Sequence, residues 1–263
     1  MRASPTVGGG QRSPSMRPSR STRPALEDAR VLVVGVGGLG SPAAMALADA
    51  GVGTIGLVDP DRVEPSNLHR QPLYTEADIG RPKVDAAAAR LRGGHPRLRV
   101  ETAAVRFGAG SRSLVAGFDV VLDGTDSIGA KFDVNDAAIA ARVPLVHAGA
   151  IGWQAQLLTI LPGLSACYRC LFEEPPPPDE VPSCQEAGVL GPAVVLAGSV
   201  QAAEAIRLLT GAAPSFADRL LAIDTRTGSW RRIAVTHRLD CPACGNLHHD
   251  TIAPRSAQRW VAR

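Results

Sequence analysis

The sequence predicts an α/β protein with a doubly wound, mostly parallel sheet of the Rossmann type. Apolar runs rich in Val, Leu and Ile recur along the first 150 residues, and Ala-rich segments of helical length separate most of them. A glycine-rich turn joins the first run to a helix, as is typical of this fold. Patterns typical of antiparallel strands appear only later in the chain, so we expect them at the C-terminal side of the sheet.

The apolar runs predict five buried parallel strands, at residues 30–35, 54–59, 98–105, 118–123 and 144–150. Antiparallel strands are expected at residues 155–162 and 219–237, the second segment being interrupted by a Thr-Gly turn. A strongly helical segment between them begins at Pro192 and ends at Gly211.

One folded domain is expected over residues 25–250, between a tail at 1–24 and a tail at 251–263. The 263 residues can bury a full core, and 45% hydrophobic with 20% charged residues is ordinary for a globular protein. Residues 1–24 hold five Arg, four Pro and no acid, too little apolar surface to fold. Removing these five charges leaves 23 basic against 25 acidic residues, so no nucleic-acid partner is indicated.

The sequence favours a cytoplasmic protein without a membrane segment. The N-terminal tail lacks the apolar run of a secretory signal. The longest uncharged run, Val143–Tyr168, has 26 residues but contains two Pro and several polar side chains, which suits buried strands.

A phosphate-binding turn is predicted where the first strand meets its helix. Gly35, Gly37 and Gly40 form a GxGxxG pattern, with Gly38 inside it, whose backbone N–H groups can hold phosphate. Asp59 lies 19 residues past Gly40 at the end of the next strand and can accept hydrogen bonds from ribose. This pair does not distinguish NAD from ATP, since both contain adenosine diphosphate, and a merely tight turn is the structural alternative.

Three side chains after the second strand suggest a polyphosphate ligand. Asn67 and Arg70 follow Asp59 closely, and Lys83 lies in the first turn of a predicted helix, where the helix dipole disfavours a cation. The chain has only two Lys against 26 Arg, so a lysine here suggests a compact charge for phosphate oxygens. A solvated surface lysine is the alternative.

Two carboxylates follow the fourth strand, at the edge where open α/β sheets bind ligands. Asp126 is the sharper candidate for Mg²⁺ beside a polyphosphate, with Asp123 as a possible helper. For each of them alone, helix capping is an equally good explanation.

Four of the five cysteines form two CxxC pairs, Cys167 with Cys170 and Cys241 with Cys244. Four thiolates in such pairs predict a closed, structural zinc site, and ordinary thiols are the alternative. The remaining Cys184 lies on a Pro-rich segment.

Together these motifs resemble the ThiF/MoeB/HesA family, bacterial relatives of ubiquitin-activating enzymes. The resemblance covers about residues 28–246 and rests on the ordered segments GVGGLGSPAAMALADAGVGTIGLVDPDRVEPSNLHRQPLYTEADIGRPK, DGTDS, CYRC, CQEAGVLGP, GSVQAAEAIRLLTG and CPACG. It implies an adenylyltransferase that uses ATP to adenylate the C-terminal glycine of a ubiquitin-like sulfur carrier protein ending in Gly-Gly. It further implies a homodimer with Mg²⁺ and structural Zn²⁺, and a separate sulfur donor is expected.

The resemblance also implies residue roles. Asp59 is expected to hold the ribose, Asp126 the magnesium ion, and Asn67, Arg70 and Lys83 the phosphates. In relatives that serve thiamin synthesis, the cysteine matching Cys184 can bond covalently to the carrier; an inert loop cysteine is the alternative.

The chain departs from the family pattern in two places. It has no N-terminal R-Y-x-R-Q motif, whose arginine in the family reaches the ATP of the partner subunit. The tail contains Arg17, Arg20 and Arg23, but no motif around them shows which one would take that role. Ser127 replaces the Asn expected after Asp126, and Lys131 stands where an arginine is typical. The missing motif makes a noncatalytic scaffold for nucleotide and carrier the main competing hypothesis. An NAD(P)-dependent oxidoreductase, which would explain the glycines and Asp59, is a weaker one. The pathway that the carrier serves, thiamin, molybdopterin or other, stays open.

Overall fold

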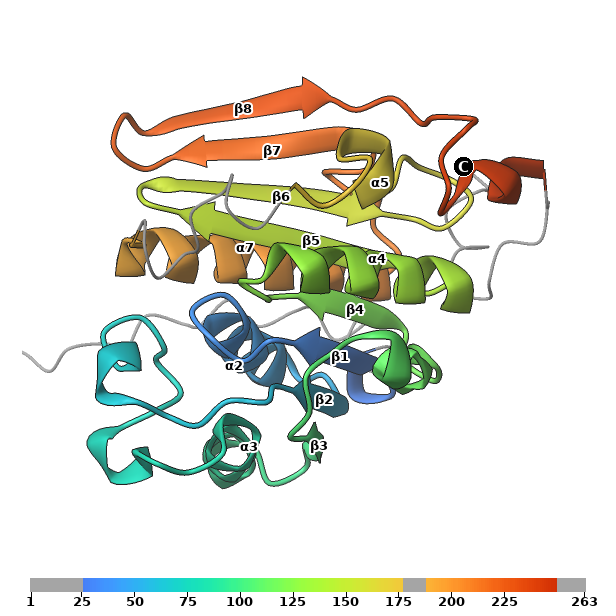
Figure 1. Cartoon of the computed structure of the whole chain (residues 1–263). Helices are drawn as coiled ribbons and strands as arrows, with labels where there is room; N and C mark the ends of the chain where they lie inside the picture. Colours follow the sequence, from blue (N-terminus) through green and yellow to red (C-terminus); the bar gives the residue numbers. More distant parts are fainter. Residues whose placement is uncertain (1–25, 177–187, 250–263) are drawn as a thin grey trace, which may run out of the picture.

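The computed structural model describes residues 26–176 and 188–249, which form one eight-stranded sheet with helices on both faces (Figure 1). The strand order is β3-β2-β1-β4-β5-β6-β7-β8. The strands are β1 (Arg30–Val34), β2 (Thr54–Val58), β3 (Arg99–Ala103), β4 (Val120–Asp123), β5 (Leu145–Ile151), β6 (Gln154–Ile160), β7 (Arg219–Asp224) and β8 (Ser229–Ala234). The helices are α2 (Gly40–Ala50), α3 (Lys83–Gly94), α4 (Ile128–Ala141), α5 (Tyr168–Leu171) and α7 (Gly191–Leu209), with 3₁₀ turns η1 (Pro65–Asn67), η2 (Glu76–Asp78), η3 (Ala109–Val115) and η4 (Gly245–His249).

The predicted fold class is confirmed. Strands β3, β2, β1, β4 and β5 are parallel, and β6, β7 and β8 add to the β5 edge in antiparallel order. The segment predicted at residues 219–237 forms β7 and β8 around the expected Thr-Gly turn. Predicted boundaries are off by one to three residues, as at β3, because apolar pattern does not mark where ladder hydrogen bonds stop. The expected tails at 1–24 and 251–263 lie outside the described residues, so the domain limits stay predictions.

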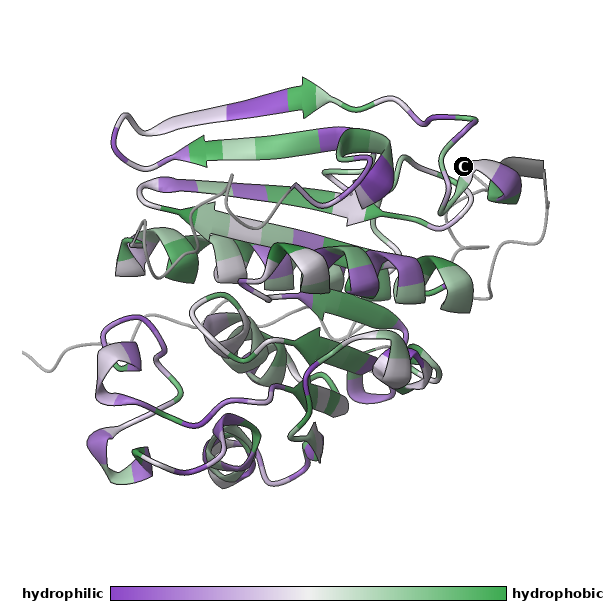
Figure 2. Ribbon diagram, in the orientation of Figure 1, coloured by the Kyte–Doolittle hydropathy of each residue, from purple (hydrophilic) through white to green (hydrophobic). Residues whose placement is uncertain are grey.

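The central parallel strands β1, β2 and β4 are mostly apolar because helices cover both of their faces, whereas the edge strand β3 is mostly exposed. In β1, Val31 and Val33 pack with α2, α3 and α7, whereas Leu32 and Val34 pack on the opposite side with α4. Figure 2 shows β1 and β4 as hydrophobic along their length, in contrast to the edge strand β8. The core therefore lies in two layers, one on each side of β1 and β4.

Helix α7 is the longest helix of the described chain and lies opposite α4 across the sheet (Figure 1). By length and composition alone it could cross a membrane, but half of its apolar window is buried inside the fold. Gln201 on this helix donates from Nε2 to the carbonyls of Asp123 and Val146, at 2.8 and 2.7 Å, and so ties α7 to β4 and β5. These features are those of a core helix.

Candidate nucleotide site and four-cysteine cluster

A cavity of about 330 Å³ lies at the carboxyl ends of β1, β2 and β4. The crossover after β1 leads to β2 on one side of β1, and the crossover after β4 leads to β5 on the other side. Open α/β sheets bind ligands at such a switch point. Eight of the predicted ligand-binding residues line this cavity: Gly35, Gly37, Gly38, Asp59, Asn67, Arg70, Lys83 and Asp126. The fold thus brings together side chains that are up to 91 residues apart in the sequence.

The glycine turn is fixed by close backbone contacts. Gly35 has φ of +83°, and a Cβ there would lie 2.7 Å from the carbonyl carbon of Gly124. A Cβ on Gly40 would lie 1.9 Å from the Gly35 carbonyl oxygen, so Gly40 is needed for packing at the start of α2 and does not itself line the cavity. Helix α2 has no side-chain cap at its N-terminus, and Gly37, Gly38 and Leu39, which lead into it, line the cavity.

Asp59 connects β2 to the glycine turn. Its Oδ2 accepts from the Val36 N–H at 2.7 Å, and its Oδ1 accepts from the Asp61 N–H at 2.9 Å. Burial raises the pKa of this carboxyl, and the charge of Lys83 and the two backbone donors only partly offset the rise. Each carboxyl oxygen retains a lone pair that a hydroxyl group of a ligand in the cavity can use.

Lys83 is buried rather than solvated, with a relative exposure of 6%. Its Nζ pairs with Asp61 Oδ2 at 2.9 Å, while Asp61 itself stays exposed to solvent. The backbone N–H of Lys83 donates to the Asp61 carbonyl at 2.9 Å, which places the start of α3 beside the end of β2. Lys83 lines the cavity, and its ammonium group has an acidic partner that solvent can reach.

Asn67 and Arg70 reach the cavity from the 3₁₀ turn η1 and the segment after it. Asn67 is buried, and its Oδ1 accepts from the Glu64 N–H at 3.3 Å. The Arg70 Nη1 donates to the Ser66 carbonyl at 2.7 Å, which leaves other donors of the guanidinium free to contact an anion. The cationic side chains that line the cavity are Arg62, Arg70, Lys83, Arg106 and Lys131.

The two carboxylates after β4 have different surroundings. Asp126 is exposed and lines the cavity, and the helix α4 is capped by Ser127, whose Oγ accepts from the Ala130 N–H. The capping alternative therefore does not describe Asp126. Asp123 is completely buried, and both of its oxygens already accept hydrogen bonds from protein groups, so it does not serve as a ligand for a metal ion.

Lys131 and His147 were not singled out as site residues from the sequence, but they surround Asp123. Lys131 Nζ lies 3.4 Å from Asp123 Oδ2 and donates to the carbonyls of Thr125 and Ala148, at 2.6 and 2.8 Å. Burial acts to raise the pKa of Asp123, but Lys131 and the hydrogen bonds from His147 and Thr125 hold it well below its usual value. A lone histidine inside the apolar run 144–150 was the available signal for His147.

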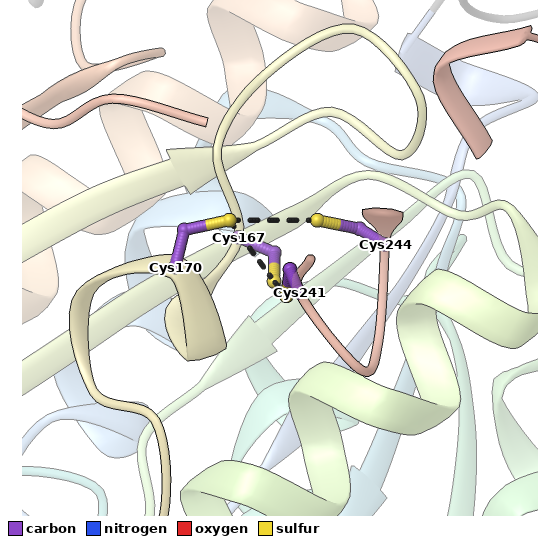
Figure 3. Close-up of side chains that lie close together, drawn as sticks. All are labelled: Cys167, Cys170, Cys241 and Cys244. Carbon is purple, nitrogen blue, oxygen red and sulfur yellow. Dashed lines mark hydrogen bonds between the residues drawn. The ribbon is translucent and has the colours of Figure 1, made fainter. Parts of the chain in front are cut away.

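The four cysteines of the two CxxC pairs come together, as Figure 3 shows. Their sulfur atoms all lie within 4.8 Å of one another, with Cys167 3.6 Å from Cys241 and Cys170 3.5 Å from Cys244. Four thiolates around a tetrahedral zinc ion, at Zn–S of about 2.3 Å, would stand roughly 3.8 Å apart. The cluster therefore fits zinc in spacing and in donor type.

The thiols of the cluster shift one another's pKa in opposite directions. A hydrogen bond from Cys244 is the main cause that lowers the pKa of Cys167, to about 5, whereas burial raises the pKa of Cys170 and the hydrogen bond to Cys167 raises that of Cys244. A thiolate is the form that binds metal. The cluster joins the segment before α5 to the segment after β8, next to Asn135 of α4, whose Oδ1 accepts from the Tyr168 N–H.

Four predicted residues cannot be placed. Cys184 and the three arginines Arg17, Arg20 and Arg23 lie outside the described residues. Their proposed roles stay predictions from the sequence.

The comparisons with known proteins identify the family of this chain. A model of the ThiF family matches residues 17–243. The chain is 42% identical over 227 residues to the sulfur carrier protein adenylyltransferase of Thermus thermophilus, covering 84% of each chain. It is 41% identical over 229 residues to the sulfur carrier protein ThiS adenylyltransferase of Escherichia coli, covering 86% of this chain and 90% of the relative.

Solved structures show the same architecture. The crystal structure of Escherichia coli MccB matches with a TM-score of 0.77 at 22% identity, covering 86% of this chain and 68% of that one. This likeness concerns the fold, whereas the family model and the sequence relatives reach over most of the chain. The chain therefore belongs to the ThiF family.

Proposed function

We propose that this protein is an adenylyltransferase that uses ATP to adenylate the C-terminal glycine of a ubiquitin-like sulfur carrier protein and releases pyrophosphate. The observation that carries the proposal is the convergence of the glycine turn, Lys83, Arg70 and Asp126 on one cavity. The relatives named as sulfur carrier protein adenylyltransferases supply the substrate class.

Different residues of the cavity would contact the ribose and the phosphates of ATP. Asp59 would accept hydrogen bonds from the ribose hydroxyls, and the N–H groups of the glycine turn would hold phosphate at the start of α2. Lys83, Arg70 and Asn67 would contact the remaining phosphates. Asp126 would hold Mg²⁺, which neutralises charge on the polyphosphate.

The reaction needs no nucleophile from the protein. The carboxylate of the carrier attacks the α-phosphorus, so the protein has to bring two anions together and stabilise the departing pyrophosphate. Cations in a partly closed cavity do both, because they offset the repulsion in the ground state and the charge of the transition state. Lys83 would share its charge between Asp61 and the phosphate oxygens.

The four-cysteine cluster would bind structural zinc. Protein sulfurs fill all four positions, so the ion would have no open site for a substrate. We further propose a homodimer in the cytoplasm that works with a separate sulfur donor, as the resemblance to the family suggests.

Magnesium-dependent exchange of labelled pyrophosphate into ATP tests the proposal. Exchange should appear when a carrier ending in Gly-Gly is supplied and vanish with the same carrier lacking its last glycine. A folded, metal-loaded protein that binds ATP and carriers but gives no exchange across a panel of carriers would favour the noncatalytic scaffold. Saturable NAD(P) binding in place of ATP binding would instead favour the oxidoreductase.

A further inference from the structure

A buried polar cluster supports the turn that carries Asp126. It consists of Asp123 at the end of β4, Thr125 in the turn, Lys131 on α4 and His147 on β5. Asp123 and His147 are partners in the parallel β4–β5 register, and both are at most 1% exposed. A carboxylate buried this deeply needs charged or hydrogen-bonded partners, so every contact in the cluster matters.

The two carboxylate oxygens of Asp123 contact different groups. Oδ1 accepts from the Thr125 N–H at 3.0 Å and from the Thr125 hydroxyl at 2.7 Å, which closes the turn. Oδ2 accepts from His147 Nδ1 at 2.7 Å and lies 3.4 Å from Lys131 Nζ. The shortest contact on the Oδ2 side is therefore the one from His147.

The surroundings of His147 define the tautomer that makes this contact. Burial lowers the pKa of the imidazole although Asp123 acts to raise it, so the ring is neutral at pH 7. The proton then sits on Nδ1, which faces the carboxylate, and Nε2 has no hydrogen-bond partner within the described part of the chain. On its other side the ring packs against Tyr168, with 4.6 Å between ring centroids.

The turn held by this cluster shapes the cavity in two ways. It leads directly to Asp126, whose carboxylate lines the cavity and whose position depends on the turn. It also backs the glycine turn, because Gly124 packs against Gly35 too closely for any Cβ. A shift of Asp123 would therefore move both the magnesium candidate and the phosphate-binding backbone.

We propose that His147 is a positioning residue of the nucleotide site: its Nδ1–H holds Asp123, and Asp123 holds the turn that presents Asp126 and supports the glycine turn. This inference rests on the nucleotide-binding role proposed above. Lys131 acts on the same carboxylate but also lines the cavity, so its replacement changes the charge that a ligand meets. His147 does not line the cavity, which makes its positioning effect separable from direct contact.

Two substitutions separate the donor of His147 from its ring. His147→Phe keeps a ring against Tyr168 but removes the hydrogen-bond donor. His147→Asn removes the ring but keeps a donor, because its amide nitrogen is bonded to Cγ as Nδ1 is in histidine. Thr159→Val is a matched control, because it deletes a buried hydrogen bond to a carboxylate, from Thr159 Oγ1 to Glu204 at 2.8 Å, on β6 away from the cavity. Zinc content and melting temperature are recorded for each protein.

The readout is the Kd of ATP measured by calorimetry without any carrier, once with excess Mg²⁺ and once with EDTA. We expect His147→Phe to weaken Mg·ATP binding by about tenfold, as for other groups that orient a metal-binding carboxylate, and His147→Asn to stay within about twofold of wild type. In EDTA, His147→Phe should weaken ATP binding less than it does with Mg²⁺, because Asp126 then holds no ion and only the support of the glycine turn is affected. Thr159→Val should lower the melting temperature and leave both Kd values unchanged.

Wild-type affinity for Mg·ATP in His147→Phe would overturn the proposal. Equal losses in His147→Phe and His147→Asn would also overturn it, because the loss would then not depend on whether a hydrogen-bond donor faces Asp123. If His147→Phe does not fold, His147→Ala replaces it with the same expected difference from His147→Asn. Normal Mg·ATP binding without exchange would count against the proposed function alone, whereas no ATP binding by wild-type protein would overturn both.

Discussion

At the residue scale, the candidate site contains two lysines that each form an ion pair with an aspartate. Lys83 faces Asp61, and Lys131 faces Asp123, each across a contact of 3.4 Å or less. The first acid is exposed and the second is completely buried. Lys83 can therefore exchange its partner for a phosphate oxygen at low cost, whereas Lys131 cannot leave Asp123 without stranding a buried charge.

This difference predicts that Lys83 acts on the substrate. Lys83→Met keeps most of the buried volume and removes the charge, and Asp126→Ala removes the proposed magnesium ligand. Each should lower the rate of carrier-dependent pyrophosphate exchange by roughly 10²-fold or more, with an unchanged circular dichroism spectrum. Arg90→Met, an exposed charge on the same helix α3 outside the cavity, is the control and should exchange normally. Near-normal exchange in Lys83→Met or Asp126→Ala would mean that the phosphate site lies elsewhere.

The buried His147 predicts a pH dependence of stability. Its folded-state pKa is lowered by burial below the usual 6.5, so the unfolded chain binds the proton more readily. The stability that this group contributes is full above about pH 6.5 and is lost as the pH falls below that value, by at most about 1.4 kcal/mol per pH unit. Urea unfolding from pH 8 to pH 5 should show a smaller loss in His147→Asn than in wild type. Parallel curves for the two proteins would show that His147 is protonated as readily in the folded state.

At the element scale, the four-cysteine cluster joins segments that the sheet alone does not hold. Cys167 is the N-cap of the single-turn helix α5 and Cys170 lies within it, whereas Cys241 and Cys244 follow the edge strand β8, which is mostly exposed. The two pairs meet through their sulfur atoms, and the hydrogen bond from the Tyr168 N–H to Asn135 Oδ1 ties the α5 side of the cluster to α4. Val235, Cys241 and Cys244 also pack into the core beside α4, so a metal ion would add a further attachment for the C-terminal segment.

Metal binding at this cluster is therefore expected to be structural. Purified protein should contain about one zinc ion per chain by elemental analysis, and Cys167→Ser or Cys241→Ser should lose both the ion and several kcal/mol of stability. Cys184→Ser should keep the zinc content and the melting temperature of wild type. A zinc-free preparation that stays stable and active would contradict the metal assignment.

At the scale of the whole molecule, the order of the strands places the site. The crossovers after β1 and β4 run to opposite sides, so the ends of these strands leave a crevice between them. The proposed adenylation takes place there, whereas the later sulfur step begins from the acyl-adenylate. The two steps make separate demands on the protein, since only the second can use a thiol.

Cys184 provides the test of this separation. Cys184→Ser should retain full pyrophosphate exchange, because the carrier's own carboxylate attacks ATP. Formation of the carrier thiocarboxylate with a defined sulfur donor should fall, and a covalent carrier adduct that reducing agents cleave should be absent. Mass spectrometry of the carrier measures both. Equal thiocarboxylate yields from Cys184→Ser and wild type would identify Cys184 as an ordinary loop residue.

The sequence by itself determined the features that depend on local pattern. Continuous apolar runs separated by helices specify parallel strands, and the spacing of Gly35, Gly37 and Gly40 after the first run specifies the tight turn between β1 and α2. The two CxxC pairs likewise predicted the four-cysteine cluster, because the donors that a zinc site requires are few in kind and closely spaced within each pair.

Only the tertiary structure decided which side chains face one another. Asp123 and Asp126 looked alike in the sequence, yet one is buried among Lys131 and His147 and the other is open to the cavity. Lys83 could have been a surface residue until the contact with Asp61, 22 positions earlier, placed it inside. The physical reason is that a strand's apolar pattern fixes its presence in the sheet, whereas its neighbours and register, such as Asp123 opposite His147, arise when distant segments pair.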